Sequence, residues 1–223
     1  MWMQYPAVEE LFSVDDQFLI GSALLVKPVT APGVTQTTVL FPSKDTWYDV
    51  DTLEAVVNSF KDDGVVTLTV SSDIEQIPVY QRASTIIPRK LRLRRSSHVM
   101  KKDPYTLYVA LDSTNKASGK LYMDDEETFG HTKRNEYAVA QFTFEESVLR
   151  NAVEVGSGWA SSVEELKEGR LVERVIIMGL TNAPTSVSVD GKPLGFEHDA
   201  VSKSLVLRKP EVSALDNWEI VFA

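Results

Sequence analysis

The amino-acid sequence predicts an all-β protein built from two successive β units. Short runs of apolar, β-branched and aromatic residues recur about every 8–12 residues, which is typical of a β-sandwich. Proline, Asp-Gly and polar turn signals separate these runs. A basic stretch around residues 92–103 interrupts the pattern, which then starts again. The 223 residues are long enough for one large domain or two modest ones.

A smaller unit is predicted before the basic stretch. Asp63-Gly64 is a strong hairpin signal, and Pro42 and Pro88 each end an apolar run. The runs that predict strands there cover residues 23–26, 37–41, 47–50, 65–70, 77–80 and 85–87.

A larger unit is predicted after the basic stretch. From Tyr137 to Phe144 the residues alternate, so Ala138, Ala140, Phe142 and Phe144 should share one face of a strand, because successive side chains point to opposite faces. Asp190-Gly191 predicts a second hairpin turn. The one helix candidate is residues 162–168, which Ser162 could cap. The runs that predict strands cover residues 106–111, 119–123, 137–144, 172–180, 187–189, 204–207 and 218–222.

Composition excludes several classes of protein. The 32 acidic and 23 basic residues give a net charge of −9, which argues against a general nucleic-acid binder. The absence of cysteine excludes a disulfide scaffold, a thiolate metal site and a cysteine nucleophile. No apolar run approaches the ~20 residues of a membrane-spanning helix. The charge is uneven, since one stretch carries eight bases and no acid: Arg82, Arg89, Lys90, Arg92, Arg94, Arg95, Lys101 and Lys102.

The acidic run from Asp124 to Glu127 is the first candidate for chemistry. On an extended strand Asp124 and Glu126 would point the same way, with Cα atoms about 6.6 Å apart. Such a pair could serve as acid and base in glycoside hydrolysis. A solvated acidic turn at the end of a strand is the favoured interpretation, because four like charges repel one another.

The histidines and the basic segment are further candidates. His98, His131 and His198 lie far apart in polar contexts, so surface positions are favoured over a triad or a metal site. In residues 90–95 leucine alternates with arginine, which on a strand would put Leu91 and Leu93 on one face. That segment could bind an anion or an acidic partner. The favoured alternative is an exposed strand and linker whose arginines pair with acids elsewhere in the chain.

Aromatic residues could form a platform on which a sugar stacks. Packing in the β-sandwich cores is the favoured alternative. The residues concerned are Trp2, Trp47, Trp159, Trp218, Tyr48, Tyr105, Tyr108 and Tyr122.

Several stretches, in order, resemble the carboxyl-terminal region of family 31 glycoside hydrolases over residues 1 to about 150. The segment from Asp16 to Val29 matches the family's Asp-Gln-Phe-Leu-x-Gly-x-x-Leu-Leu-Val-x-Pro-Val motif. The other stretches are Met1 to Pro6, Phe41-Pro42 with Trp47-Tyr48-Asp49, Gln81 to Pro88, and Leu121 to Thr128.

The resemblance implies an enzyme role. Residues 86–92 and 103–111 look most like the members of this family that work in the lumen of the endoplasmic reticulum. These enzymes remove α-1,3-linked glucose from N-glycans and have a non-catalytic β subunit as partner. The resemblance implies no cofactor, no metal and no nucleic acid.

The resemblance also implies that this chain holds no catalytic residue. The family is a retaining α-glucosidase whose two catalytic aspartates come from barrel loops, and its Trp-x-Asp-Met-Asn nucleophile motif is absent here. Residues 1–17 would be the end of the barrel, 18–98 a proximal β-sandwich and 99–223 a distal one. We expect a barrel on another chain that binds most of the N-glycan, and no hydrolysis of α-glucosides by this chain alone. The substrate-binding residues are unknown.

Two departures from the family pattern stand out. Ala83-Ser84 and Glu126 replace family glycines, which suit turns with positive φ, so those turns could be reshaped. The fragment interpretation predicts an exposed apolar patch around Trp2, Phe12, Phe18 and Leu19. The alternatives are a stand-alone carbohydrate-binding β-sandwich and an anion-binding adaptor that uses Arg89 to Arg95.

Overall fold

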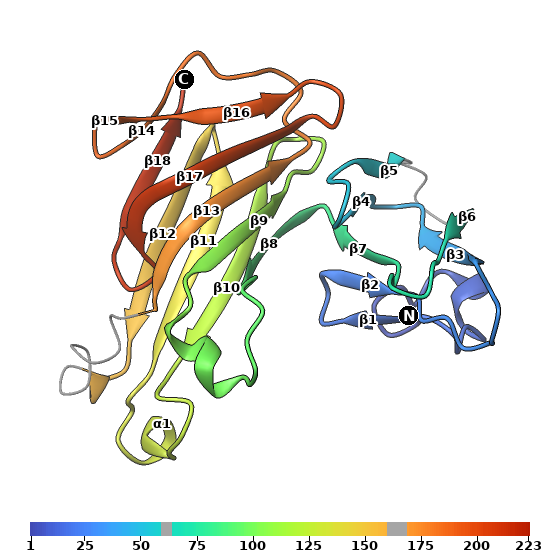
Figure 1. The fold of residues 1–223 in the computed structure, drawn as a ribbon, viewed down its shortest axis with the longest axis horizontal. Helices are drawn as coiled ribbons and strands as arrows, with labels where there is room; N and C mark the ends of the chain where they lie inside the picture. The colour runs from blue at the N-terminus through green and yellow to red at the C-terminus, as the bar shows by residue number, and fades with distance from the viewer. Residues whose placement is uncertain (59–63, 160–168) are drawn as a thin grey trace. The chain divides into compact units, whose positions relative to one another are not determined.

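The structure is a computed structural model that describes residues 1–58, 64–159 and 169–223. The chain forms two compact units, Met1–Thr85 and Ile86–Ala223 (Figure 1). The prediction of an all-β protein is confirmed. The helices among the described residues are short: η1 (Glu9–Leu11), η2 (His98–Lys102) and α1 (Gly130–Lys133). The helix expected at residues 162–168 lies outside the described residues.

The first unit contains two antiparallel sheets. One has the strand order β1-β2-β7-β4-β5, and the other pairs β3 with β6. The bounds are β1 (Phe18–Ile20), β2 (Leu24–Val26), β3 (Gln36–Pro42), β4 (Thr46–Asp49), β5 (Ala55–Asn58), β6 (Val65–Ser71) and β7 (Val79–Arg82).

One apolar core holds the first unit together. Phe41 and Trp47 are fully buried, and the Phe41 ring meets Tyr80 edge to face at 4.7 Å. The amino-terminal segment belongs to the same core, since Tyr5 and Leu11 are buried in it. Residues 1–17 therefore pack with the first unit rather than standing apart from it.

The second unit is built on one large sheet. Its strand order is β15-β14-β18-β12-β11-β10-β8-β9-β13-β17-β16, and β9 and β13 run parallel. The bounds are β8 (Ser84–Arg89), β9 (Tyr105–Ala110), β10 (Ala117–Met123), β11 (Ala138–Glu145), β12 (Val148–Val155), β13 (Leu171–Met178), β14 (Val187–Val189), β15 (Lys192–Leu194), β16 (Phe196–Asp199), β17 (Ser204–Ser213) and β18 (Trp218–Phe222).

The large sheet folds around a single apolar core. That core joins Phe142 of β11 and Ile220 of β18 with Ile177 of β13 and Leu207 of β17, which come from opposite parts of the strand order. The alternation predicted for the strand at 137–144 is confirmed, because Ala138, Ala140, Phe142 and Phe144 are all buried. The hairpin at Asp190-Gly191 is also confirmed, and both residues have positive φ.

The structure also differs from the predicted pattern. Strands β1, β5, β12, β15 and β16 have no counterpart among the predicted runs. The two units divide between Thr85 and Ile86, ahead of the basic stretch in which the sequence suggested a boundary. The assignment of residues 18–98 and 99–223 to proximal and distal sandwiches stays a prediction.

Candidate functional site

The acidic run is a turn, not part of a strand. β10 ends at Met123, and Glu126 has a φ of +58°, so the favoured interpretation of a turn at the end of a strand is confirmed and the extended pair of Asp124 and Glu126 does not form. The Asp125 carboxylate accepts hydrogen bonds from the amides of Glu127 and Thr128, at 3.1 and 3.0 Å, and from Thr128 Oγ1 at 2.6 Å. These donors lower the pKa of Asp125 to about 2. The carboxylate therefore stays ionised and holds the turn together, a role unlike that of a general acid.

Basic side chains neutralise this turn from the side of η2. Lys101 Nζ lies 2.9 Å from Glu127 Oε1 and donates to the Asp125 carbonyl at 3.1 Å. The hydrogen bond and the charge of Lys101 hold the pKa of Glu127 below its usual value. The basic stretch and the acidic run, far apart in the sequence, are thus partners.

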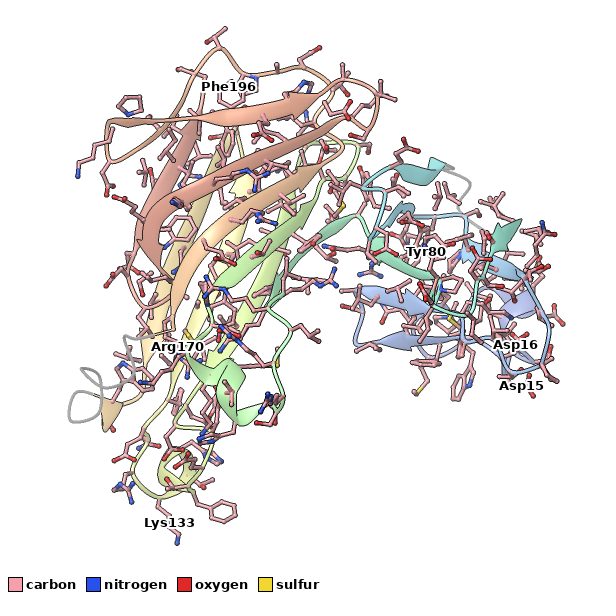
Figure 2. The ribbon with its side chains drawn as sticks, viewed as in Figure 1. Asp15, Asp16, Tyr80, Lys133, Arg170 and Phe196 are labelled. Atoms are coloured by element: carbon pink, nitrogen blue, oxygen red, sulfur yellow. The ribbon has the colours of Figure 1, made fainter. Side chains whose placement is uncertain are left out.

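Arg170 supports the same turn from inside the second unit (Figure 2). Its side chain is only 4% exposed. Nη1 donates to the Tyr105 hydroxyl at 2.9 Å and lies 3.3 Å from Glu126 Oε1, while Nη2 donates to the Asp124 carbonyl at 3.0 Å. The buried guanidinium has three acceptors for its two terminal nitrogens, whereas its Nε has no hydrogen-bond partner among the described residues, and the guanidinium ties the turn to β9.

Two of the three histidines also reach the turn. His98 Nδ1 lies 3.8 Å from Glu127 Oε1, and His131 Nδ1 lies 3.5 Å from Asp124 Oδ2. His198 is elsewhere, with Nε2 2.9 Å from the Leu180 carbonyl oxygen. The sequence did not indicate that His98 and His131 both lie at the acidic turn, because the two residues are 33 positions apart. Within the described ranges, the His, Asp and Glu side chains form no group of three or more that could hold a metal ion.

The basic segment is not the strand that its alternating pattern suggested. Residues 90–97 have no regular secondary structure, and Leu93 is almost fully exposed. Two of its arginines, Arg92 and Arg94, pair with acids, as the favoured interpretation held. Arg92 Nη2 lies 2.8 Å from Glu173 Oε2, and Arg94 contacts both oxygens of Asp103. The positive charges of Arg92 and Arg94 are therefore already paired within the chain, and an anion-binding adaptor would need them for its ligand.

Lys90 is also engaged within the second unit. Its Nζ donates to the Met100 and Lys101 carbonyls, at 3.0 and 2.8 Å, and lies 4.8 Å from the centre of the Tyr105 ring. Burial lowers the pKa of Lys90. The Lys90 side chain therefore holds η2 in place through the carbonyl groups of Met100 and Lys101.

Most of the candidate aromatic residues are core residues. Trp47, Trp159 and Trp218 are buried, as are Tyr48, Tyr105 and Tyr108. Trp2 is 55% exposed and Tyr122 is 51% exposed. A single platform made of all eight residues is thus excluded.

Exposed apolar side chains are concentrated in the first 20 residues. Trp2, Phe12 and Phe18 are exposed, as expected, but Leu19 is partly buried against the core. Ile20 is exposed in its place, because Phe18 and Ile20 share one face of β1 and Leu19 points to the other. Exposed apolar groups of this size commonly mark an interaction surface.

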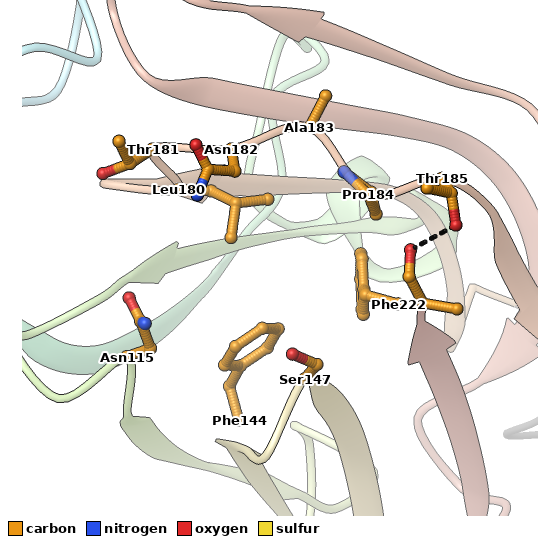
Figure 3. Close-up of a pocket in the computed structure, with 11 residues that line it drawn as sticks. Asn115, Phe144, Ser147, Leu180, Thr181, Asn182, Ala183, Pro184, Thr185 and Phe222 are labelled. Atoms are coloured by element: carbon orange, nitrogen blue, oxygen red, sulfur yellow. Dashed lines mark hydrogen bonds between the residues drawn. The ribbon is translucent and has the colours of Figure 1, made fainter.

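The second unit also has a hollow of about 360 Å³ (Figure 3). Phe144 and Phe222 contribute to its lining, and Thr185 Oγ1 donates to the Ala223 carbonyl at 3.0 Å. None of the side chains that line it is acidic, basic or a histidine. The lining therefore offers no group for acid–base chemistry.

Of the three residues that replace family glycines, Ser84 and Glu126 keep a positive φ, and Ala83 does not. Ser84 has a φ of +63° and Glu126 a φ of +58°. At Ser84 and Glu126 the turns are therefore not reshaped into conformations with negative φ. The strain of a side chain at positive φ is carried by this protein instead.

Comparison with known proteins identifies the relatives of this fold. Residues 1–87 match the glycosyl hydrolase family 31 C-terminal domain. Neutral alpha-glucosidase AB of Dictyostelium discoideum is 40% identical over 218 residues, which cover 95% of this chain and 22% of that protein. The chain thus spans less than a quarter of the length of this curated relative. Among the described helices, none has the length and apolarity that a bilayer crossing requires.

Solved structures show the same relationship. The glucosidase II alpha subunit in its alpha3-Glc2-bound form has a TM-score of 0.84 and 30% identity, and the match covers 100% of this chain and 25% of that chain. The ER glucosidase II heterodimeric complex, which consists of the catalytic subunit and the binding domain of the regulatory subunit, gives the same TM-score, identity and coverage.

Proposed function

Because the chain belongs to glycosyl hydrolase family 31, we propose that it is the non-catalytic carboxyl-terminal part of a retaining α-glucosidase. The observation that carries this proposal is the 40% identity to a neutral alpha-glucosidase, which runs across both units rather than over one motif. In this proposal the two β units support a catalytic barrel that the described residues do not contain.

The exposed apolar side chains of residues 1–20 fit this supporting role. Trp2, Phe12 and Phe18 face outward from a segment whose other side is anchored in the core by Tyr5 and Leu11. Covering those side chains with a barrel surface would remove apolar area from water, at about 25 cal/mol per Å². The segment is thus suited to join the first unit to a larger partner.

The acidic turn supports a role other than catalysis for this chain. Its carboxylates serve as hydrogen-bond acceptors and ion-pair partners for Thr128, Lys101 and Arg170. A retaining glycosidase needs one carboxyl group whose raised pKa lets it donate a proton. The pKa of Asp125 is instead lowered to about 2, so this carboxyl group has no proton to donate near neutral pH. We propose that the catalytic aspartates lie in the barrel.

The finer proposal is a glucosidase II-like enzyme that removes α-1,3-linked glucose from N-glycans in the lumen of the endoplasmic reticulum. The relatives support it, since one solved structure contains an alpha3-linked glucose disaccharide and another is described as ER glucosidase II with its regulatory subunit. A non-catalytic β subunit would then be a partner of the assembled enzyme.

The experiment that tests the proposal compares the chain alone with the chain co-expressed with a family 31 barrel. The chain alone should release no p-nitrophenol from p-nitrophenyl α-glucoside, and the complex should release it. Phe12→Ser and Phe18→Ser should reduce co-purification with the barrel, while Leu93→Ser, at an exposed site in the second unit, should not. Measurable turnover by the chain alone would overturn the proposal.

A further inference from the structure

Two exposed aromatic rings of the second unit occur in one place. Tyr122 is 51% exposed and Phe129 is 70% exposed, and the other Phe, Tyr and Trp side chains of residues 86–223 in the described ranges are buried or half-buried. Tyr122 lies near the end of β10, and Phe129 immediately precedes α1. Exposed aromatic residues gathered at one site in a unit that buries the rest mark an interaction surface.

The two rings belong to a row of four. The ring centres of Phe129 and His131 are 6.2 Å apart, those of His131 and Tyr122 are 6.5 Å apart, and those of Tyr122 and Tyr137 are 6.0 Å apart. Tyr122 and Tyr137 are nearly parallel, at 20°. We call Tyr122, Phe129, His131 and Tyr137 the aromatic row.

Hydrogen bonds and an ion pair connect residues next to the aromatic row. Arg134 and Glu136 form a two-armed ion pair with both hydrogen bonds at 2.6 Å, just after α1. The Glu136 carboxylate lies directly beside Gly130, where a Cβ atom would come into close contact with Glu136 Oε2. The Gly156 amide donates to the Tyr137 carbonyl at 2.8 Å, which fixes the last member of the row.

Polar groups adjoin the rings. The Asp124 side chain is 17% exposed and lies 3.5 Å from His131 Nδ1, and the His131 side chain is 35% exposed. Asp124 Oδ1 is oriented by the Glu126 amide, which donates to it at 2.8 Å. The site therefore combines flat apolar faces with a carboxylate and an imidazole at their edge.

We infer that the aromatic row is a binding site for a neutral oligosaccharide. A pyranose ring has an apolar C–H face, which suits an aromatic ring, and hydroxyl groups at its rim, which suit Asp124 and His131. The chemistry of the site favours a sugar, because the exposed rings of Tyr122 and Phe129 stand beside a carboxylate and an imidazole rather than in a wider apolar surface.

The choice of α-linked glucose as the ligand rests on the proposed function. The test is a titration of the 223-residue chain with nigerotriose, an α-1,3-linked glucose trimer, followed by the amide NMR shifts of both units. Saturable shifts should be confined to the residues around the aromatic row. Tyr122→Ala and Phe129→Ala should each weaken binding about tenfold, since an aromatic contact contributes up to roughly that factor.

Two controls separate stacking from loss of structure. Tyr122→Phe keeps the ring and should retain most of the affinity. Leu93→Ala removes a more exposed apolar side chain of the same unit and should leave the affinity unchanged. The proposal is wrong if nigerotriose produces no saturable shifts at the row, or if Tyr122→Ala and Phe129→Ala bind it as well as the parent chain does.

The same variants distinguish this inference from the proposed function. In the complex with the barrel, Leu93→Ala should leave turnover of p-nitrophenyl α-glucoside unchanged, and that turnover is measured separately from nigerotriose binding. If turnover occurs but nigerotriose does not bind the row, only the further inference fails. If nigerotriose binds but the complex has no α-glucosidase activity, only the proposed function fails.

Discussion

Gly119 of β10 lies directly against the backbone of Ile86 in β8. A Cβ atom at Gly119 would overlap the Ile86 carbonyl oxygen and stand 2.8 Å from its carbonyl carbon. Neither atom can rotate away, because both belong to the backbone of a strand within the sheet. The close approach of two strands therefore depends on the absence of a side chain.

Gly119→Ala should destabilise the second unit by about 2–3 kcal/mol, because the added methyl group forces the strands apart. The matched control is Gly195→Ala, since a Cβ there would meet nothing within 4 Å. Urea denaturation followed by the amide signals of the second unit measures both. Equal midpoints for the two variants would contradict the packing described for Gly119.

Glu126 combines backbone strain with an ion pair to Arg170, and two substitutions separate these effects. Glu126→Ala keeps the positive φ and loses the pair, whereas Glu126→Gly loses the pair but relieves the strain. The glycine variant should therefore be more stable than the alanine variant by about 1 kcal/mol. Denaturation midpoints at pH 7 provide the measurement. An alanine variant at least as stable as the glycine variant would show that the turn is unstrained.

Asp125 should make stability depend on pH in the acid range. Its folded pKa of about 2 lies below its ordinary value of 3.8, so its contribution is fully present above pH 4 and is lost as the pH falls from 4 to 2. Asp125→Asn keeps an acceptor oxygen but cannot titrate.

After allowance for solvent screening, this variant should be less stable by about 1 kcal/mol at pH 7 and should approach the parent chain near pH 2. Denaturation midpoints of both proteins across this range test the prediction. Parallel pH profiles would rule out a contribution from the Asp125 carboxylate.

Arg170 should stabilise the second unit through the Tyr105 hydroxyl and the Asp124 carbonyl. Arg170→Met removes both donors and should cost about 2–3 kcal/mol, because the Tyr105 hydroxyl is buried and would lose its partner. Tyr105→Phe removes the other end of that bond.

A double-mutant cycle of these two substitutions should give a coupling energy of about 1 kcal/mol or more. Free energies of unfolding for the parent, the two single variants and the double variant supply it. Strictly additive effects would show that Arg170 acts through its other contacts alone.

Strands with local alternation were predictable from the sequence, and strands with a mixed pattern were not. In β11 every second residue is small or aromatic and buried, so the period of two was visible. β12 contains the buried Asn151, whose amide donates to the Ala214 and Asp216 carbonyls. A buried amide whose partners are more than 60 residues away leaves no local signal in the sequence, so β12 is absent from the predicted strands.

The turns and candidate sites show the same contrast. Asp190-Gly191 marked its hairpin because both residues tolerate positive φ. The environment of the acidic turn could not be predicted, since Lys101, His131 and Arg170 reach it from separate elements. For the same reason, the exposure of Tyr122 and Phe129 beside His131 emerged only in the structure.

By itself the sequence determined the fold class, the relationship to family 31 and most of the strands. These features depend on residue order and short-range periodicity, and both can be read directly from the amino-acid sequence. Tertiary structure alone decided which charges neutralise one another, which aromatic rings face water and where glycine is indispensable. Those outcomes depend on distances between residues that are remote in the sequence, and only the packing of the sheets sets such distances.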